Sequence, residues 1–429
     1  MREQLQRTLG TPGMLFIGIN GVVGGGIFLL PGQVAERAGP AAVWAYLAAG
    51  VVVILIGLCF AEVSTMYDRT GGPLVYAQEA MGQTAGFTVG WMVWLTYLLG
   101  WALLSNGFIG YLGSLWTPAQ DYGAFIIVGL VVLLCLLNTF GVRLGVGVIQ
   151  FFTVAKLVPL TILIIAGLTF AGASGNGTLG LVSPGSGDFL GAVLIIIFAY
   201  GGFEAATIPA GEMVNPRRTI SVAVLGTLGA VTVFYMLIQY AALRIEPELA
   251  SSSSPLASVG EAMFAGGLTL MTLGALLSIG GTQSGIALIS SRSLYALSRE
   301  GMLPRFLGWI HPRFRTPIVS IWLTGSLVVV LTITGTFQQL LLLNVAARLY
   351  QYLMVCISVV ILRLRNPEAE RPFRLPLGVA IPVLAAGLCV LLLTQQPLVN
   401  LLAALGALAV GLTLYAVGGS RSPAPEGES

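Results

Sequence analysis

Long apolar runs follow one another along almost the whole chain and are separated by short polar stretches. A helix needs about 20 predominantly apolar residues to cross a bilayer. Runs of suitable length are found at residues 12–38, 40–66, 83–115, 122–141, 145–171, 187–212, 218–243, 263–298, 316–335, 338–362, 376–395 and 397–418. The pattern therefore predicts an all-α membrane protein with twelve transmembrane helices in one domain. The polar tail, residues 419–429, is expected to be disordered.

The composition agrees with a membrane location. Hydrophobic residues make up 56% of the 429 residues and charged residues only 9%, whereas about a quarter of a soluble protein is charged. Most strongly basic residues lie in alternate loops, with only Arg37 and Arg244 near the edges of the other loops. Short cytoplasmic loops are the ones enriched in Lys and Arg. Both termini are therefore predicted to be cytoplasmic. The arginines on that side are Arg2, Arg7, Arg69, Arg143, Arg217, Arg218, Arg299, Arg305, Arg313, Arg315, Arg363, Arg365, Arg371, Arg374 and Arg421.

Glycine clusters interrupt two of the predicted helices. The first segment carries Gly21 and Gly24, Gly25 and Gly26 in its middle, where glycine weakens a helix. A broken segment would present the N-terminus of a half-helix near Ile27 to an anion such as a carboxylate. Taken alone, the cluster fits equally well with close packing of small residues between helices.

The sixth segment favours the broken-helix interpretation. It carries Gly201, Gly202 and Pro209 around a carboxylate in mid-segment, Glu204. Segments one and six are corresponding positions of two five-helix halves, and paired interruptions of this kind point to the central site of a transporter. We therefore expect a 5+5 inverted repeat, residues 12–171 and 187–362, followed by two accessory helices within residues 376–418.

Lys156 is the only lysine in the chain, and it lies in the middle of an apolar segment. A cation at that depth costs roughly 2.5–3.5 kcal/mol on insertion scales, so it marks a functional site with a polar partner. The alternative is a lysine that reaches the interface with its side chain. Among other polar residues, Glu62 and Arg292 are interpreted as interfacial or gate pairs, and His311 as structural. Arg348 fits either an interfacial position or the outer vestibule.

The chain lacks the residues that an enzyme, a metal site or an ATP-driven pump would need. The four cysteines, Cys59, Cys135, Cys356 and Cys389, lie in apolar segments, where a thiol behaves as a small hydrophobe. The membrane segments contain no His pair, Asp pair or cysteine cluster, and the chain has no GxxxxGK[ST] motif. We therefore expect no enzyme, metal site, cofactor, ATP-driven pump or nucleic-acid partner. A channel or sensor is a weaker alternative, because neither needs two matched helix breaks.

Ordered motifs along the chain resemble the amino acid–polyamine–organocation transporter superfamily. They read GVVGGGIFLLPG, CFAEVSTMYDRTGGPLVYAQEAMG, FAYGGFEAATIPAGEMVNPRR, SSRSLYALSREGMLPRFLGWIHPRFRTP and LRNPEAERPF. FAYGG, SREGMLP and RNPEAERPF are most similar to the L-type amino acid transporters. Two features depart from that branch. Glu204 replaces a more frequent asparagine, and WTPAQDYG has no cysteine, so no disulfide-linked heavy chain is expected.

The resemblance implies a carrier for which the substrate's carboxylate and ammonium bind mainly to the backbone. Gly25 and Gly26 would donate amides to the carboxylate, and carbonyls would accept from the ammonium. Phe198 would also be an aromatic gate, although ordinary helix packing would explain it too. The expected substrate-binding residues are Val22, Gly24, Gly25, Gly26, Phe198, Ala199, Gly201 and Glu204.

The same resemblance gives Lys156 a role. In members that work without sodium, a lysine on the fifth helix replaces the ion, and its partners here would be a carbonyl near Gly18 or Gly21 and a hydroxyl of Thr282 or Ser284. The implied function is sodium-independent transport of neutral L-amino acids across a bacterial plasma membrane, by exchange or with a proton. The alternative on the same fold is a carrier of amines, polyamines or other amino acid derivatives.

Overall fold

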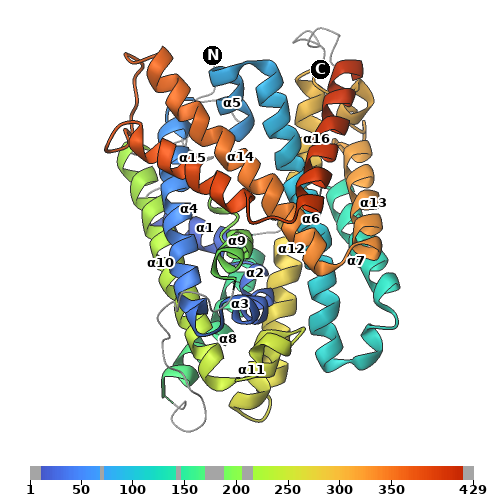
Figure 1. The fold of residues 1–429 in the computed structure, drawn as a ribbon. Coiled ribbons are helices and arrows are strands. Elements are labelled where there is room, and N and C mark those ends of the chain that lie inside the picture. The colour runs from blue at the N-terminus through green and yellow to red at the C-terminus, as the bar shows by residue number, and fades with distance from the viewer. Residues whose placement is uncertain (1–10, 68–71, 142–145, 170–187, 205–215, 419–429) are drawn as a thin grey trace. The chain divides into compact units, whose positions relative to one another are not determined.

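The computed structural model describes residues 11–67, 72–141, 146–169, 188–204 and 216–418, and every regular element within them is a helix (Figure 1). The helices from the N-terminal half are α1 Thr11–Val22, α2 Gly26–Leu29, α3 Pro31–Ala38, η1 Gly39–Ala41, α4 Ala42–Ser64, α5 Pro73–Met81, α6 Gln83–Leu115, η2 Thr117–Ala119, α7 Gly123–Thr139, α8 Val146–Thr169 and α9 Phe189–Ala199. The remaining helices are α10 Pro216–Ile245, η5 Leu249–Ser251, α11 Pro255–Met263, α12 Gly267–Arg299, η6 Arg305–Gly308, α13 Ile318–Thr334, α14 Phe337–Arg365, α15 Ala380–Leu393 and α16 Leu398–Gly418.

Each apolar run predicted from the sequence contains a helix, and α6 has the predicted bounds. Residues 205–212 of segment six, which include Pro209, and the tail at residues 419–429 lie outside the described residues. Two short helices, α5 and α11, were not predicted. Both begin with proline, Pro73 and Pro255, which suits the first helical position, but each is too short to appear as an apolar run.

The described helices support a membrane-embedded chain. Seven are long and apolar enough to cross a bilayer: Pro31–Ser64, Gln83–Leu115, Phe152–Thr169, Val222–Ile245, Gly267–Arg299, Phe337–Arg365 and Leu398–Gly418. Four shorter apolar helices are Gly123–Thr139, Phe189–Ala199, Ile318–Thr334 and Ala380–Leu393. The protein is therefore an integral membrane protein with multiple spans.

The chain divides into two compact units, each built from three separate stretches. The first unit contains residues 1–86, 157–271 and 349–395, and the second contains residues 87–156, 272–348 and 396–429. Four helices contribute to both units, because α6 is divided after Gly86, α8 after Lys156, α12 after Met271 and α14 after Arg348.

In the first unit, α10 packs along α4 and α1 (Figure 1). Glycines allow these helices to approach closely. A Cβ added to Gly18 of α1 would lie 2.3 Å from Oγ1 of Thr227, and one added to Gly50 of α4 would lie 2.4 Å from Oγ1 of Thr232. Small residues at helix contacts are typical of membrane proteins. α10 therefore supports both α1 and α4.

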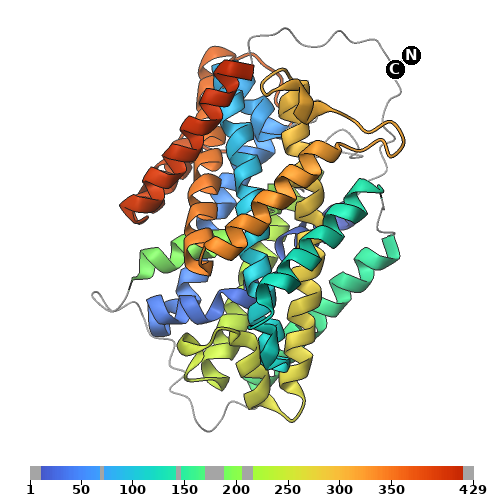
Figure 2. The ribbon, with the colours of Figure 1, turned by 90° about the vertical axis from the view of Figure 1, so that its right-hand side faces the viewer.

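In the second unit, α6 packs against α16 and α7 against α13 (Figure 2). Trp91 of α6 donates its ring N–H to the carbonyl of Ala407 at 2.9 Å. The side-chain amide of Asn344 in α14 donates to the carbonyl of Thr96 in α6 at 2.6 Å. Polar contacts between helices therefore supplement the apolar packing of this unit.

Candidate functional site

The first segment is interrupted, as predicted. α1 ends at Val22, and α2 begins at Gly26 and is followed by α3 from Pro31. Gly25 precedes α2, and no side chain caps the helix start. The first amides of a helix have no carbonyl partner within that helix. The amide of Phe28 donates to the carbonyl of Gly25 at 3.1 Å, so the start of α2 offers the backbone N–H groups of the buried Gly26 and Ile27, at the predicted position.

The end of α9 is the second interruption, and it packs directly on the first. The helix ends at Ala199, and Gly202 adopts φ +109°, a conformation that favours glycine. A Cβ added to Gly202 would lie 2.3 Å from the carbonyl oxygen of Gly21. Glycine is therefore required at position 202 by both the backbone conformation and the contact with the first segment.

Gly26 makes a further contact between the two interrupted segments. A Cβ added there would lie 3.0 Å from the Cα atom of Ala199 and 3.3 Å from Cδ1 of Phe198. Phe198 is 8% exposed. The structure therefore brings Gly26 of the first segment against Phe198 and Ala199 of the sixth. The predicted residues Gly24 and Gly25 lie between α1 and α2, and Gly201 follows α9.

Tyr235 of α10 links the two interruptions. Its hydroxyl lies 3.0 Å from the carbonyl oxygen of Val22 and 3.1 Å from that of Ala199. A hydroxyl has one hydrogen, so it donates to only one of these carbonyls at a time. Each carbonyl can therefore accept another donor when the hydroxyl turns to its neighbour. Tyr235 is fully buried.

A second tyrosine fixes the chain just after α9. The hydroxyl of Tyr200 lies 3.0 Å from both the carbonyl oxygen of Tyr46 in α4 and Oγ1 of Thr232 in α10. The rings of Tyr200 and Tyr235 meet edge to face, with centroids 5.5 Å apart, and those of Tyr46 and Tyr235 do so at 5.9 Å. This tyrosine framework holds the ends of α1 and α9 against α4 and α10.

Glu204 is held by contacts within the first unit. Its Oε2 accepts from the amide of Gly202 at 2.7 Å, and its Oε1 accepts from the hydroxyl of Tyr352 in α14 at 2.8 Å. The neighbouring Phe203 packs among Phe60 and Tyr352, with ring centroids 5.4 and 5.5 Å away. The carboxylate therefore ties the interrupted segment to α14.

The predicted cation-site residues lie on three helices. Lys156, in α8, is 6% exposed, and Gly18 packs against α10 in the first unit. The hydroxyls of Thr282 and Ser284 donate to carbonyls of their own helix, those of Ser278 at 2.8 Å and Gly280 at 3.0 Å. A hydroxyl oxygen keeps lone pairs that can accept from an ammonium. The proposed contacts of Lys156 with these groups, and with the carbonyl of Gly21, stay predictions.

Glu62 forms an ion pair, whereas its predicted place at the membrane interface or in a gate stays a prediction. Its carboxylate accepts from the guanidinium of Arg363, with Nε at 2.7 Å from Oε1, and from the amide of Leu375 at 2.7 Å. Arg371 lies 3.6 Å from the same carboxylate. Glu62 therefore ties the end of α4 to the segment between α14 and α15.

The other three polar residues singled out from the sequence also have defined surroundings, and the exposed Arg292 donates to the carbonyl of Leu288 in its own helix at 3.3 Å. His311 Nδ1 accepts from the amides of Arg313 and Phe314 at 3.2 and 3.3 Å, which supports its structural role. Arg348 is only 7% exposed, so a guanidinium extended to the interface is disfavoured.

Sequence reasoning missed three residues. Tyr235 and Tyr352 lie in apolar segments, where nothing in the sequence shows which carbonyl or carboxylate their hydroxyls meet. Gln283 of α12 is fully buried, and neither of its amide atoms has a hydrogen-bond partner among the described residues. A glutamine in an apolar run is a visible signal of a polar site, and it was not used. Within the described residues, no three His, Cys, Asp or Glu side chains are grouped to hold a metal.

Comparison with known proteins identifies the family. Residues 9–417 match the amino acid permease family, so the chain belongs to it; this is a transporter family with the LeuT-like fold, within the amino acid–polyamine–organocation superfamily. The chain is 27% identical to a methylthioribose transporter of Bacillus subtilis, covering 96% of this chain and 93% of that one. It is 30% identical to the serine/threonine exchanger SteT of the same organism, covering 89% of each. It is 27% identical to the mouse b(0,+)-type amino acid transporter 1, covering 90% of this chain and 82% of that one. The protein is thus an amino acid transporter of this family and not an enzyme.

Proposed function

We propose that this protein moves neutral L-amino acids by alternating access, without sodium, in exchange for another amino acid or together with a proton. The observation that carries the proposal is the direct packing of the two interrupted segments, in which Gly202 meets Gly21 and Gly26 meets Ala199. Both segments leave backbone groups outside helices at one place. A site made of backbone groups can bind the α-carboxylate and α-ammonium groups that all amino acids share.

The two charged groups of an amino acid fit this place. The amides at the start of α2 and the positive end of that helix suit a carboxylate. The carbonyls of Val22 and Ala199 share the single hydroxyl hydrogen of Tyr235, so an ammonium supplies the donors that the hydroxyl alone cannot. Gly24, Gly25 and Gly26 are the proposed carboxylate ligands, and Phe198 and Gly201 complete the proposed site.

The division into units supports two equivalent five-helix repeats, residues 12–171 and 187–362. Segments one, two, six and seven belong mainly to the first unit, and segments three, four, eight and nine to the second. Segments five and ten each pass from the second unit to the first, after Lys156 and Arg348. Segments that are five places apart in the chain thus have the same assignment to the two units, as a repeat requires.

Lys156 is the proposed replacement for a coupling cation. It is the chain's only lysine, it is buried, and it lies where α8 passes from one unit to the other. An ammonium is a compact point charge with three donors, so it can bind oxygen atoms that a sodium ion would otherwise hold. Its proposed partners are the carbonyls near Gly18 and Gly21 and the hydroxyls of Thr282 and Ser284.

A neutral substrate is favoured because Glu204, an acid in the sixth-segment interruption, is already bound to Tyr352 and Gly202. The proposed topology has twelve spans with both termini in the cytoplasm of a bacterial cell. The proposed carrier works without a disulfide-linked partner, since Cys59, Cys135, Cys356 and Cys389 are all buried.

The test is uptake of labelled amino acids into proteoliposomes, either empty or preloaded with unlabelled amino acids. We expect neutral amino acids to be accumulated, with faster uptake into preloaded vesicles for exchange or dependence on an imposed pH gradient for proton coupling. Uptake of none of them by folded protein would contradict the proposal.

The relative that transports methylthioribose gives a second candidate, because that compound has no carboxylate. An amine carrier on the same fold would also dispense with the carboxylate. Competition separates these functions. We expect leucine to inhibit uptake far more strongly than leucinamide, a simple amine or methylthioribose. Equal inhibition by leucinamide would favour an amine carrier, and stronger inhibition by methylthioribose a sugar carrier.

A further inference from the structure

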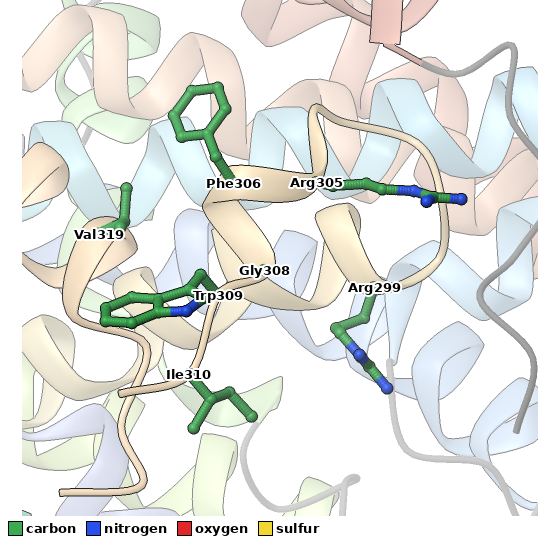
Figure 3. Close-up of a pocket in the computed structure, with 7 residues that line it drawn as sticks. All are labelled: Arg299, Arg305, Phe306, Gly308, Trp309, Ile310 and Val319. Carbon is green, nitrogen blue, oxygen red and sulfur yellow. The ribbon is translucent and has the colours of Figure 1, made fainter. Parts of the chain in front are cut away.

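A pocket of about 670 Å³ lies between the end of α12 and the start of α13 (Figure 3). All of its lining belongs to the second unit. Two of the lining residues are arginines, one is a glycine, and the others are apolar. The lining residues are Arg299, Arg305, Phe306, Gly308, Trp309, Ile310 and Val319.

The wall of the pocket is held in place by buried contacts. Leu307 is 5% exposed and anchors the short helix η6. Ser298 of α12 donates to the carbonyl of Pro304 at 2.8 Å, and Ser320 of α13 donates to the carbonyl of Leu307 at 2.7 Å. The loop is thus fixed from both flanking helices, and the pocket is formed before anything binds.

The charge in the pocket is unbalanced. Arg299 and Arg305 both lie to the right of the apolar side chains in Figure 3, with Arg305 pointing to the right and Arg299 downward, and no acid lines the pocket. Neither guanidinium has an ion-pair partner in the part of the chain that the structure describes. Guanidinium groups bind phosphate oxygens with two parallel hydrogen bonds. The basic side therefore suits a phosphate group.

Large apolar side chains adjoin these arginines and are open to the surroundings. Phe306 is 60% exposed, Trp309 47% and Ile310 42%. The pocket lies beyond Arg299, the last residue of an apolar helix long enough to span a membrane. Tryptophan is enriched at the membrane interface. The apolar side therefore suits acyl chains at the surface of a bilayer.

We propose that this pocket binds an anionic glycerophospholipid of the cytoplasmic leaflet. The headgroup phosphate would bind Arg299 and Arg305, and the acyl chains would cover Phe306, Trp309 and Ile310. Basic pockets beside cytoplasmic helix ends favour anionic headgroups. The assignment to the cytoplasmic leaflet follows the arginine distribution, and the pocket lining shares no residue with the site proposed for the transported substrate.

The experiment measures lipid retained by the detergent-purified full chain in native mass spectrometry. Phosphatidylglycerol and phosphatidylcholine with identical acyl chains are the two probes. Arg299→Gln/Arg305→Gln is compared with Arg313→Gln/Arg374→Gln, which removes two charges from other exposed cytoplasmic arginines. Size-exclusion chromatography checks the folding of each variant, and the single variants Arg299→Gln and Arg305→Gln replace the double variant if it aggregates.

We expect wild-type protein to retain phosphatidylglycerol in preference to phosphatidylcholine. Surface charge contributions predict a loss of affinity of about fivefold for each arginine removed and about 25-fold for both, with no such loss in the control pair. Equal retention by the two double variants, or equal retention of both lipids by wild-type protein, would overturn the proposal. Displacement of phosphatidylglycerol by millimolar inorganic phosphate would overturn it as well, because the site would then be one for a free anion.

Discussion

Gly202 contacts Gly21 so closely that a Cβ on Gly202 would lie 2.3 Å from the carbonyl oxygen of Gly21. This contact joins the interrupted part of the sixth segment to that of the first. It also explains why both interruptions are rich in glycine. Backbone carbonyls and amides outside the helices of the two segments can approach each other only where no side chain lies between the segments.

The first prediction concerns this contact. We expect Gly202→Ala to lower the melting temperature and to abolish uptake, because a residue with φ +109° would be strained by about 1–3 kcal/mol in addition to the clash. Thermal unfolding and proteoliposome uptake measure the two effects. Gly229→Ala in α10 is the matched control, since a Cβ there meets no atom within 4 Å. Normal uptake by Gly202→Ala would show that the two interruptions do not need to touch.

The second prediction concerns the hydroxyl of Tyr235. We expect Tyr235→Phe to fold, because the ring keeps its packing against Tyr46 and Tyr200. The carbonyls of Val22 and Ala199 lose their donor, at a cost of about 0.5–1.5 kcal/mol. That loss should alter the apparent KM of uptake up to about tenfold. Tyr415→Phe, at a ring that stacks on Phe87 in the second unit, should leave KM unchanged, and the same behaviour in Tyr235→Phe would contradict the bridging role.

The third prediction concerns Glu204 and Tyr352. Tyr352→Phe leaves one carboxylate oxygen without its donor, so we expect a loss of about 1–3 kcal/mol in unfolding free energy. Glu204→Gln tests the other side of the contact, and the double variant completes a cycle. We expect a coupling of about 0.5–3 kcal/mol between the two substitutions. Additive effects on thermal stability would mean that the 2.8 Å contact contributes nothing.

The fourth prediction concerns Gln283. A fully buried amide with no partner among the described residues costs about 1–3 kcal/mol. Gln283→Met, with a similar shape and no amide, should therefore raise the melting temperature. We expect it to slow uptake at the same time, since residues kept at a cost in stability usually serve function. Higher stability with unchanged uptake would show that Gln283 has no part in transport.

The sequence predicted the helices well because length and hydrophobicity decide them. The apolar run at residues 83–115 coincides with α6, and the glycines between Val22 and Gly26 coincide with the first interruption. Length and hydrophobicity do not predict which residues hold the site together. Tyr235 touches Val22, which is 213 positions away, and Tyr352 touches Glu204, which is 148 positions away. Such pairs depend on how helices that are distant in the sequence pack together. The sequence of an apolar segment does not indicate which helices it will contact.

If Lys156 replaces a sodium ion in an amino acid carrier, the initial rate of amino acid uptake should not change when choline replaces sodium. Proteoliposomes with wild-type protein and with Lys156→Ala are compared under both conditions. We expect equal wild-type rates in choline and sodium. For folded Lys156→Ala we expect a rate of about a tenth or less, equivalent to about 1.4 kcal/mol or more. Strict sodium dependence of the wild-type protein, or normal uptake by Lys156→Ala, would contradict this role of Lys156.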